Sequence, residues 1–255
     1  DATFMRMKED HMKNGQLKAA YNLQIATENQ FVLHYDVFSN PTDTKTLLPL
    51  LETYPHDLKT VVADAGYGSE ENLLRLDEKE VNHLIKYAMF DKEQKRGYKQ
   101  SARNLANWYY DDKEDSYTHP DGWCYRFHHI KHQKTQTDFQ QEIKVYYADE
   151  PESAPQKGLY MNERYQNLKA KECQALLSPE GRQIFAQRKI DVEPVFGQIK
   201  ACLGYKRCNL RGKRQVRIDM GLVLMANNLL KNPTNRLISW VFIYEIEFLC
   251  LIFND

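Results

Sequence analysis

Two carboxylates, Asp64 and Glu193, stand at positions that suit the ligands of a divalent cation. Asp64 follows the β-branched run 60–62 and precedes the glycine-rich turn 65–68. We therefore expect it at the carboxyl end of a strand, the edge at which α/β sheets bind ligands. Carboxylate oxygens suit Mg²⁺ or Mn²⁺. A pair of such ions can activate an attacking oxygen and stabilise a leaving one in phosphoryl transfer.

Glu193 lies in a segment with a helical pattern. Asp191 is a suitable N-cap, and Pro194 would then fall in the first turn, where its missing N–H has no partner. We expect a helix that begins near Asp191 and holds Glu193 at the positive end of its dipole, where a carboxylate stays ionised. The alternative is an ordinary capped amphipathic helix with a solvated glutamate.

The helical period divides this segment into two faces. The polar face carries Glu193, Gly197, Lys200 and Gly204. The apolar face carries Val192, Val195, Phe196, Ile199 and Leu203, which we expect in the core. Glycine in a helix interior costs about 1 kcal/mol relative to alanine. The two glycines therefore indicate that a backbone or a ligand approaches the polar face closely.

The charge distribution is neutral over the chain and basic in one segment. The totals are 35 basic and 35 acidic residues, which gives no global signal for a polyanionic partner. Between 182 and 217, only Asp191 and Glu193 are acidic. The basic residues there are Arg182, Arg188, Lys189, Lys200, Lys206, Arg207, Arg211, Lys213, Arg214 and Arg217. Such a cluster is typical of a surface that binds nucleic acid.

The elements that must position these residues begin with a hairpin. Apolar and polar residues alternate over 19–27 and 30–38, on either side of a turn at Glu28 and Asn29. Residues 1–15 are charged and lack a clear period, so no strand is expected there.

A strand, a turn and a helix are predicted around Asp64. Ser69 can cap a helix that runs to about Lys79, and the apolar run 81–88 predicts one more buried strand. A helix is also expected over 216–231, where its apolar residues would close the core.

Composition suggests four parts. We expect an α/β core over 1–90, a β-rich insertion with a linker over 91–180, core helices over 181–231 and an apolar tail over 232–255. Within the insertion, the polar stretch at its start and the Pro/Gly-rich stretch 151–158 are expected to lack regular structure.

No membrane span or secretion signal is expected. The apolar run 237–253 in the tail contains Glu245 and Glu247 and is too short and too charged for a convincing transmembrane helix. A buried strand or helix is favoured there, and a tail created by a frame change is the alternative. Five cysteines are scattered without a C-x-x-C pair, which favours a reducing, cytoplasmic setting. The chain opens at Asp1 rather than at Met, so we expect a fragment.

Three stretches resemble the DDE transposases of bacterial insertion sequences, and the resemblance covers 1–231. They are LKAAYNLQIATENQF, VVADAGYGSEEN and QRKIDVEPVFGQIK with the following GYKRCNLRGK. In such enzymes the second acid ends a strand in an A-D-x-G-Y context, which matches Asp64. The third lies in a Y-x-x-R…E-x-x-x-x-x-x-K signature, which Arg188, Glu193 and Lys200 match with the gap between Glu and Lys intact.

The resemblance implies a ribonuclease-H-like mixed sheet with flanking helices, interrupted by the β-rich insertion. It also implies Mg²⁺ or Mn²⁺ at Asp64 and Glu193, cleavage of DNA by water, and attack of a 3′-hydroxyl on target DNA. Such an enzyme acts as a homodimer on transposon ends and target DNA. The cations expected to hold DNA are Arg188, Lys200, Lys206, Arg207, Arg211 and Lys213.

The chain departs from the family pattern at three points. Phe185 replaces the tyrosine, so any hydroxyl contact to DNA there is lost. Four residues rather than three separate Arg188 from Glu193. The first catalytic Asp should lie on a strand before the hairpin, and Asp1 and Asp36 are poor substitutes for it. We expect an incomplete site, and a non-catalytic DNA-binding relict or a ribonuclease-H-like nuclease remains as an alternative function.

Two further groups could carry chemistry. Zinc could bind among Cys124, His128 and His132, with His119 and His129 nearby, although strand geometry favours ordinary surface histidines. Flipped bases could stack on Trp108, Tyr109, Tyr110, Trp123 and Tyr125, although core packing of a small β-subdomain is the favoured role.

Overall fold

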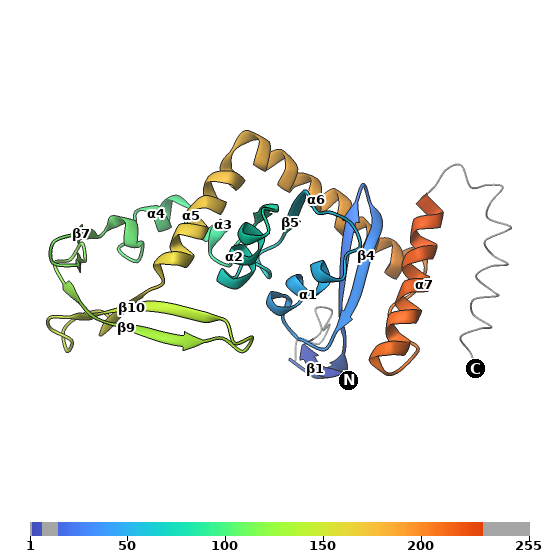
Figure 1. Cartoon of the computed structure of the whole chain (residues 1–255), viewed down its shortest axis with the longest axis horizontal. Helices are drawn as coiled ribbons and strands as arrows, with labels where there is room; N and C mark the ends of the chain where they lie inside the picture. The colour runs from blue at the N-terminus through green and yellow to red at the C-terminus, as the bar shows by residue number, and fades with distance from the viewer. Residues whose placement is uncertain (1, 7–14, 232–255) are drawn as a thin grey trace. The chain divides into compact units, whose positions relative to one another are not determined.

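The computed structural model describes residues 2–6 and 15–231 of the chain. Helices and strands are mixed along this part, which confirms the expected α/β class (Figure 1). The chain divides into two units. The first combines Asp1–Asp57 with Arg182–Asp255, and the second is Leu58–Gly181.

The first unit contains the predicted hairpin. Strand β3 (Asn22–Glu28) pairs antiparallel with β4 (Phe31–Phe38). The turn lies at Asn29 and Gln30, one residue later than predicted, with positive φ angles of 51° and 67°. Positive φ at both central residues matches the right-handed twist of the flanking strands, and Asn tolerates it well. The hairpin is therefore closed by local turn chemistry.

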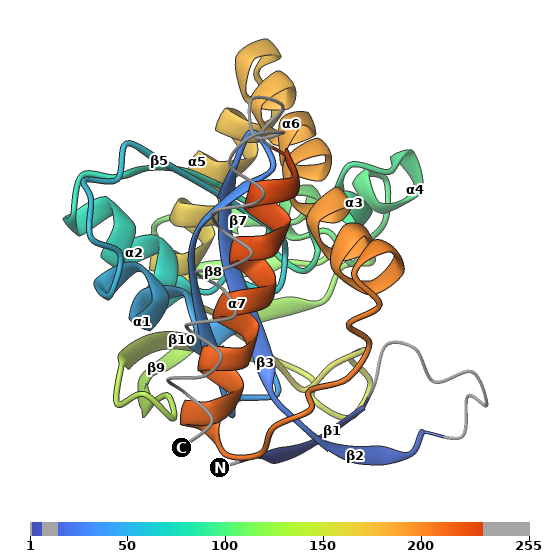
Figure 2. The same ribbon diagram turned by 90° about the vertical axis from the view of Figure 1, so that its right-hand side faces the viewer.

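Helix α7 (Lys213–Lys231) lies along this hairpin, as the sequence predicted (Figure 2). Its residues Val216 and Met220 are buried in a cluster with Val37 of β4. A Cβ atom on Gly221 would lie 2.2 Å from the Tyr35 hydroxyl, so only glycine lets the helix approach the hairpin this closely. The Tyr35 hydroxyl donates to the Arg217 carbonyl at 2.9 Å. Packing and one hydrogen bond thus hold helix and hairpin together.

A second strand pair lies before the hairpin, where none was predicted. Strand β1 (Thr3–Arg6) pairs antiparallel with β2 (Leu17–Ala20), and β2 contains residues assigned above to the hairpin. The expectation of no strand was wrong because β1 is stabilised by its pairing with β2, which the local pattern of apolar residues does not reveal. β1 itself carries no acidic residue. The 3₁₀ turn η1 (Asp43–Lys45) and helix α1 (Leu47–Glu52) complete this part of the chain.

The second unit begins with a strand, a turn and a helix, as predicted. Strand β5 (Thr60–Ala63) pairs in parallel with β6 (Asn82–Ile85), and α2 (Glu70–Glu78) connects them. Ser69 caps α2 by accepting the amide of Asn72 at 3.2 Å. Helix α5 (Glu163–Leu177) contributes Leu168 and Leu176 to the buried residues of this unit.

Short helices follow β6 where irregular structure was expected. They are α3 (Phe90–Glu93), α4 (Arg96–Lys99) and the 3₁₀ turn η2 (Leu105–Asn107). The expectation was wrong at α3 and α4. Phe90 is buried against Tyr87, with ring centroids 5.6 Å apart, so one apolar anchor stabilises a stretch that is otherwise polar.

The β-rich part of the chain forms one antiparallel sheet in the order β11-β10-β9-β8-β7. Its strands are β7 (Tyr109–Asp111), β8 (Ser116–Thr118), β9 (Cys124–Lys134), β10 (Gln140–Ala148) and β11 (Gly158–Met161). Strand β11 was missed, because its pairing with β10 is invisible in a stretch that looks like a linker. Tyr125 and Tyr146 are fully buried together with Met161. The Tyr146 hydroxyl donates to Asp115 at 2.9 Å.

Three expectations about architecture stay predictions. The strand pairs β3–β4 and β5–β6 are two-stranded sheets in different units, and their union in one ribonuclease-H-like sheet is not tested. The same holds for the part boundaries after residues 90 and 180. The apolar tail 232–255 lies outside the described residues.

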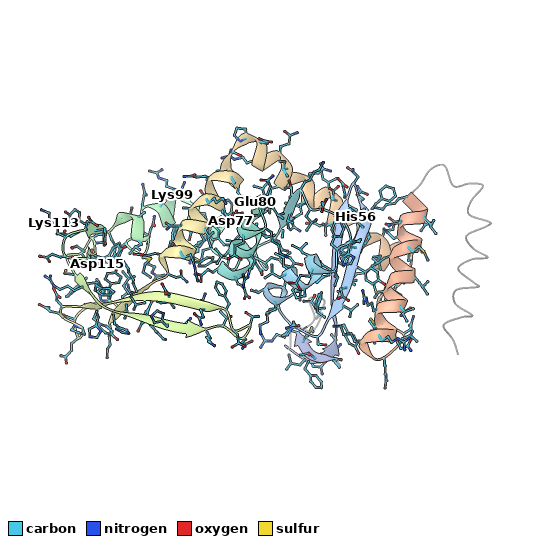
Figure 3. The ribbon with its side chains drawn as sticks, in the orientation of Figure 1. His56, Asp77, Glu80, Lys99, Lys113 and Asp115 are labelled. Carbon is cyan, nitrogen blue, oxygen red and sulfur yellow. The ribbon has the colours of Figure 1, made fainter. Side chains whose placement is uncertain are left out.

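A buried ion cluster links β6 to α2 and α5. His83 and Glu172 are 9% and 1% exposed. The His83 Nδ1 lies 2.7 Å from Glu172 Oε1, and its Nε2 lies 3.1 Å from Asp77 Oδ1 on α2. Of these three residues, Asp77 is labelled in Figure 3. Glu172 also accepts the Ile85 amide at 2.7 Å, and Lys171 pairs with Asp77. Burial alone lowers the pKa of His83, but Glu172 and Asp77 together outweigh it, and the pKa is raised.

The cluster predicts a pH-dependent stability. A raised histidine pKa means that its contribution is fully present below the unfolded value of about 6.5 and is lost as pH rises through the folded value. We expect His83→Gln to lower the free energy of unfolding by about 2 kcal/mol near pH 6, and by less at alkaline pH. Urea denaturation across this range measures the difference. His128→Gln, an exposed histidine, is the control, and a loss that does not change with pH would contradict the prediction.

Candidate active site

Asp64 directly follows β5, as predicted, and is partly exposed. Its Oδ1 accepts the amide of Gly66 at 2.9 Å, and its carbonyl accepts the amide of Tyr67 at 3.2 Å. These bonds turn the chain sharply at the strand end. The carboxylate is thereby held at the carboxyl edge of the parallel pair β5–β6, where α/β proteins place ligands.

The loop after Asp64 is held against the end of β6. A Cβ on Gly68 would lie 2.2 Å from the Lys86 carbonyl oxygen, so the two backbones touch and no side chain fits. The Tyr165 hydroxyl donates to the Gly68 carbonyl at 2.6 Å, and Asn72 Nδ2 donates to the Tyr67 carbonyl at 2.8 Å. Sequence reasoning missed Tyr165 and Asn72 as supports, and only the G-Y-G pattern signalled the tight loop.

Glu193 lies near the end of a long helix rather than at the start of a short one. Helix α6 (Pro179–Gly197) begins after Ser178, whose Oγ accepts the amide of Gly181 at 2.9 Å. The prediction of a helix start near Asp191 was wrong, because this earlier cap starts the helix and nothing before Asp191 stops it. Glu193 is therefore not at the positive end of the helix dipole, and the electrostatic argument made for it fails.

Pro194 lies inside α6, and a π-helical turn follows. Proline cannot donate to the carbonyl one turn earlier, which weakens the helix locally. The turn η3 (Gln198–Cys202) then has the wider hydrogen bond from the Leu203 amide to the Gln198 carbonyl, at 3.0 Å. Lys200 lies in this turn. Single π-helical turns occur often at functional sites.

The two predicted faces of this segment are confirmed in part: Val192, Phe196 and Leu203 of the apolar face are only half-buried. Val195 and Ile199 are buried with Leu224 of α7 in one apolar cluster. Glu193, Gly197, Lys200 and Gly204 are exposed. A Cβ on Gly197 would meet no described atom within 4 Å, so no neighbour in the described residues requires glycine there. Gly204 has a φ of 67°, which favours glycine for conformational reasons.

Arg188 lies on α6 beside the residue that replaces the family tyrosine. Its guanidinium carbon is 5.7 Å from the centre of the Phe185 ring. A cation can rest on the face of phenylalanine as well as on that of tyrosine. The substitution therefore removes a hydroxyl but keeps the ring that contacts the arginine.

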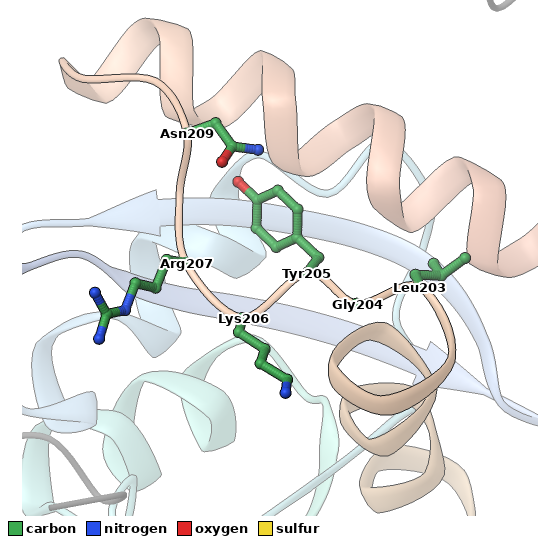
Figure 4. A pocket seen from close by; sticks show the side chains of 6 residues that line it. All are labelled: Leu203, Gly204, Tyr205, Lys206, Arg207 and Asn209. Carbon is green, nitrogen blue, oxygen red and sulfur yellow. The ribbon is translucent and has the colours of Figure 1, made fainter.

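The other predicted DNA-binding cations follow η3. Lys206, Arg207 and Arg211 are exposed in the loop that leads to α7. Lys213 begins α7, and its Nζ lies 5.5 Å from the centre of the Phe38 ring. The loop also lines an open hollow of about 380 Å³ (Figure 4).

Asp36 has structural partners. Its Oδ1 lies 3.3 Å from Arg217 Nε and accepts the amide of Val37 at 2.8 Å. The side chain is only 14% exposed. This pairing supports the view that Asp36 is a poor substitute for a first catalytic acid. Asp1 lies outside the described residues.

A family model described as "Transposase DDE domain" matches residues 1–229 of the chain. The chain belongs to the DDE transposase family. No curated protein and no solved structure matches this transposase chain. Within 2–6 and 15–231, the transposase has no helix long and apolar enough to cross a membrane.

The histidine-rich strand of the transposase does not gather a metal site among the described residues, where no three His, Cys, Asp or Glu side chains are placed to hold an ion. Cys124, His128 and His132 all lie on β9, as the strand pattern indicated. The His128 and His129 Nδ1 atoms lie 2.8 Å apart, and His132 lies 3.6 Å from Glu142. These contacts are those of surface histidines.

The aromatic residues of the transposase sheet separate into two groups. Tyr125 is fully buried, and Trp108 and Trp123 pack against its cluster, which supports a core role. Tyr109 and Tyr110 are 68% and 39% exposed. The Tyr110 hydroxyl donates to Asp115, which raises its pKa to about 12. Of this group, Tyr109 presents the most exposed ring.

The donor chemistry of the two acids fits a hard divalent cation. Asp64 is partly exposed on a supported loop of the second unit, and Glu193 is exposed on the polar face of α6 in the first unit. Both offer carboxylate oxygens, which are the ligands that Mg²⁺ and Mn²⁺ prefer. Each acid is accessible within its own unit.

Gly197 gives a test of whether the polar face of α6 must meet a ligand closely. Because Gly197 is helical and its surroundings are open, Gly197→Ala should raise the free energy of unfolding by about 1 kcal/mol. If DNA approaches this face, the same change should lower DNA nicking. Thermal unfolding and a nicking assay measure both effects.

Gly204→Ala is the matched comparison. Its positive φ predicts a loss of about 1 kcal/mol instead. Unchanged nicking by a stabilised Gly197→Ala variant would contradict the close approach of DNA to this face.

Proposed function

We propose that this chain is the catalytic part of a DNA transposase in which Asp64 and Glu193 hold Mg²⁺ or Mn²⁺. The observation that carries the proposal is the strand-end position of Asp64 on a loop fixed by backbone contact, within a chain that matches the transposase domain over 1–229. The exposed Glu193, on the polar face of α6, supplies a second carboxylate of the right chemistry.

In this proposal, the protein acts mainly by positioning. The bound ions supply activation of the attacking oxygen and stabilisation of the leaving oxygen. Asp64 and Glu193 hold those ions with carboxylate oxygens. Arg188 and Lys200 contact phosphates near the reacting strand and keep it in line, since charge-assisted contacts to phosphate orient DNA without reading its sequence.

The reaction proposed is cleavage of a DNA strand by water, followed by attack of the new 3′-hydroxyl on target DNA. The substrates are the ends of a bacterial insertion sequence and a target duplex. The assembly is a homodimer in the cytoplasm. Lys206, Arg207, Arg211 and Lys213 extend the contact to the DNA backbone, and their charge supports a partner that is a polyanion.

Removal of either metal ligand tests the assignment. Where the source DNA encodes residues before Asp1, they are expressed with the chain, so that any earlier acid is included. Asp64→Ala and Glu193→Ala should each lower Mg²⁺-dependent nicking at least about 100-fold, because a lost ligand removes ion-based stabilisation of the transition state. DNA binding should persist in both variants.

Glu180→Ala, at an exposed acid on the same helix, is the control and should nick as the wild type does. Nicking at wild-type rates by both Asp64→Ala and Glu193→Ala would contradict the proposal that these residues hold the metal ions.

A ribonuclease-H-like nuclease and a DNA-binding relict are the alternatives. The relict is favoured by one observation, the lack of any acid on β1, the strand that precedes the hairpin. A joining assay with a pre-cleaved 3′-hydroxyl end separates the three functions. A transposase joins this end to target DNA, a nuclease only cleaves, and a relict binds DNA equally with or without the metal ion.

A further inference from the structure

The buried carboxylate of Glu70 joins several parts of the second unit at the start of α2. Glu70 is the first residue of this helix and is only 3% exposed, although a glutamate is rarely buried without partners. Gln141 Nε2 and Asn162 Nδ2 lie 2.7 Å and 2.6 Å from its Oε2, and Arg164 Nε lies 2.6 Å from its Oε1. Three donors therefore compensate the buried charge.

These donors come from β10 and from the start of α5. Gln141 lies on β10, Asn162 is the residue before α5, and Arg164 is the second residue of α5. Asn162 also caps α5 by accepting the Tyr165 amide at 2.9 Å. Helix α2 has a capping residue of its own, so its cap does not depend on Glu70. Glu70 therefore serves to connect α2 to two other elements.

Strands β9 and β10 form a long hairpin in the second unit (Figure 1), and its tip contacts the same place. Arg164 Nη2 donates to the Gln140 carbonyl at 2.7 Å, and its guanidinium carbon lies 5.1 Å from the centre of the Phe139 ring. The Thr137 hydroxyl donates to Glu71, the second residue of α2. Several contacts thus fix the hairpin tip to the first turns of α2 and α5.

The loop that presents Asp64 is bonded to the same turn of α5. Gly68 lies two residues before Glu70, and its carbonyl accepts the Tyr165 hydroxyl at 2.6 Å. Tyr165 directly follows Arg164, which binds Glu70. One turn of α5 therefore holds both the loop after Asp64 and the acid that the hairpin contacts. Displacement of the hairpin tip would remove contacts from both ends of this loop's support.

We propose that Glu70 is a positioning residue for Asp64, and that docking of the β9–β10 hairpin tip on Glu70 keeps the Asp64 loop in place. The inference rests on the proposed function for one point, the role of Asp64 as a metal ligand. A loop that must first be ordered binds its cation more weakly, because the ordering costs free energy. The β-rich part of the chain thereby contributes to the affinity for the metal ion.

Gln141→Ala tests this coupling with little risk to folding. It removes one neutral donor and leaves Glu70 with Asn162 and Arg164, whereas loss of Arg164 would leave a buried charge unpaired. The amides of residues 67–69 donate within the loop, and their hydrogen exchange in the full chain without metal measures its order. We expect exchange about tenfold faster in Gln141→Ala, with wild-type exchange in β7 and β8.

Gln133→Ala is the matched control. Gln133 Nε2 donates to Gln141 Oε1 at 3.1 Å, so this variant also removes a hydrogen bond from the hairpin but keeps the donor to Glu70. It should leave exchange of 67–69 unchanged. Gln141→Lys supplies another donor to Glu70 and should restore slow exchange. Wild-type exchange in Gln141→Ala, or an equal increase in Gln133→Ala, would overturn the proposal.

The dependence of nicking on Mg²⁺ distinguishes positioning from general stability. Gln141→Ala should need several-fold more Mg²⁺ for half-maximal nicking and should approach the wild-type rate when Mg²⁺ is saturating. A purely structural role would reduce the amount of active protein and lower the rate by the same factor at every Mg²⁺ concentration. That result would count against Glu70 as a positioning residue.

The two measurements separate this inference from the proposed function. Faster exchange of 67–69 in Gln141→Ala, with no metal-dependent nicking by the wild type, would support the coupling of hairpin and loop and contradict the metal role of Asp64. Nicking that Asp64→Ala abolishes, with wild-type exchange in Gln141→Ala, would support the proposed function and overturn the inference.

Discussion

The contact of Val195 and Ile199 with Leu224 of α7 is the interaction on which the basic half of the candidate site depends. Burial of two aliphatic side chains contributes several kcal/mol, far more than any exposed charge pair on this surface. Once these side chains face α7, the helical period leaves Glu193 and Lys200 facing solvent. Packing of the apolar face therefore determines which residues of this helix are exposed. The exposed positions do not contribute to the core, so their residue types can serve function.

Asp64 is positioned by a different kind of constraint. Its loop is fixed where the backbone at Gly68 touches the backbone at Lys86. Tyr165 donates to the Gly68 carbonyl, and Asn72 donates to the Tyr67 carbonyl. A bulkier residue at position 68 would force the two strands β5 and β6 apart at the edge that presents the carboxylate. One acid is thus placed by backbone contact and the other by side-chain packing. Backbone contact gives Asp64 a rigid position at a strand end, and side-chain packing leaves Glu193 on an accessible helix face.

The sequence predicted correctly those elements that are determined by residues close together in the chain. The β5–α2 turn has its own glycines and its own cap at Ser69, and the hairpin has alternating residues and a turn that tolerates positive φ. The prediction of a helix start near Asp191 was wrong because Ser178, an earlier capping residue, already begins the helix. Strand β11 was not predicted because its pairing is with β10, a separate element of the sheet. The roles proposed for Asp64 and Glu193 rest on the family resemblance, with which their residue types and neighbours agree.

The loop that carries Lys206 and Arg207 contains no acidic residue, which explains how a neutral chain can present a positive surface there. Asp219 of α7 accepts the Tyr205 hydroxyl of this loop. Lys206 and Arg207 are exposed, so their charge is accessible to an external anion. The same bond holds the loop that carries them, which limits the entropy lost when a ligand is bound. The loop is thus held in place at Tyr205 and carries only basic charges, which suits the polyanionic partner proposed above.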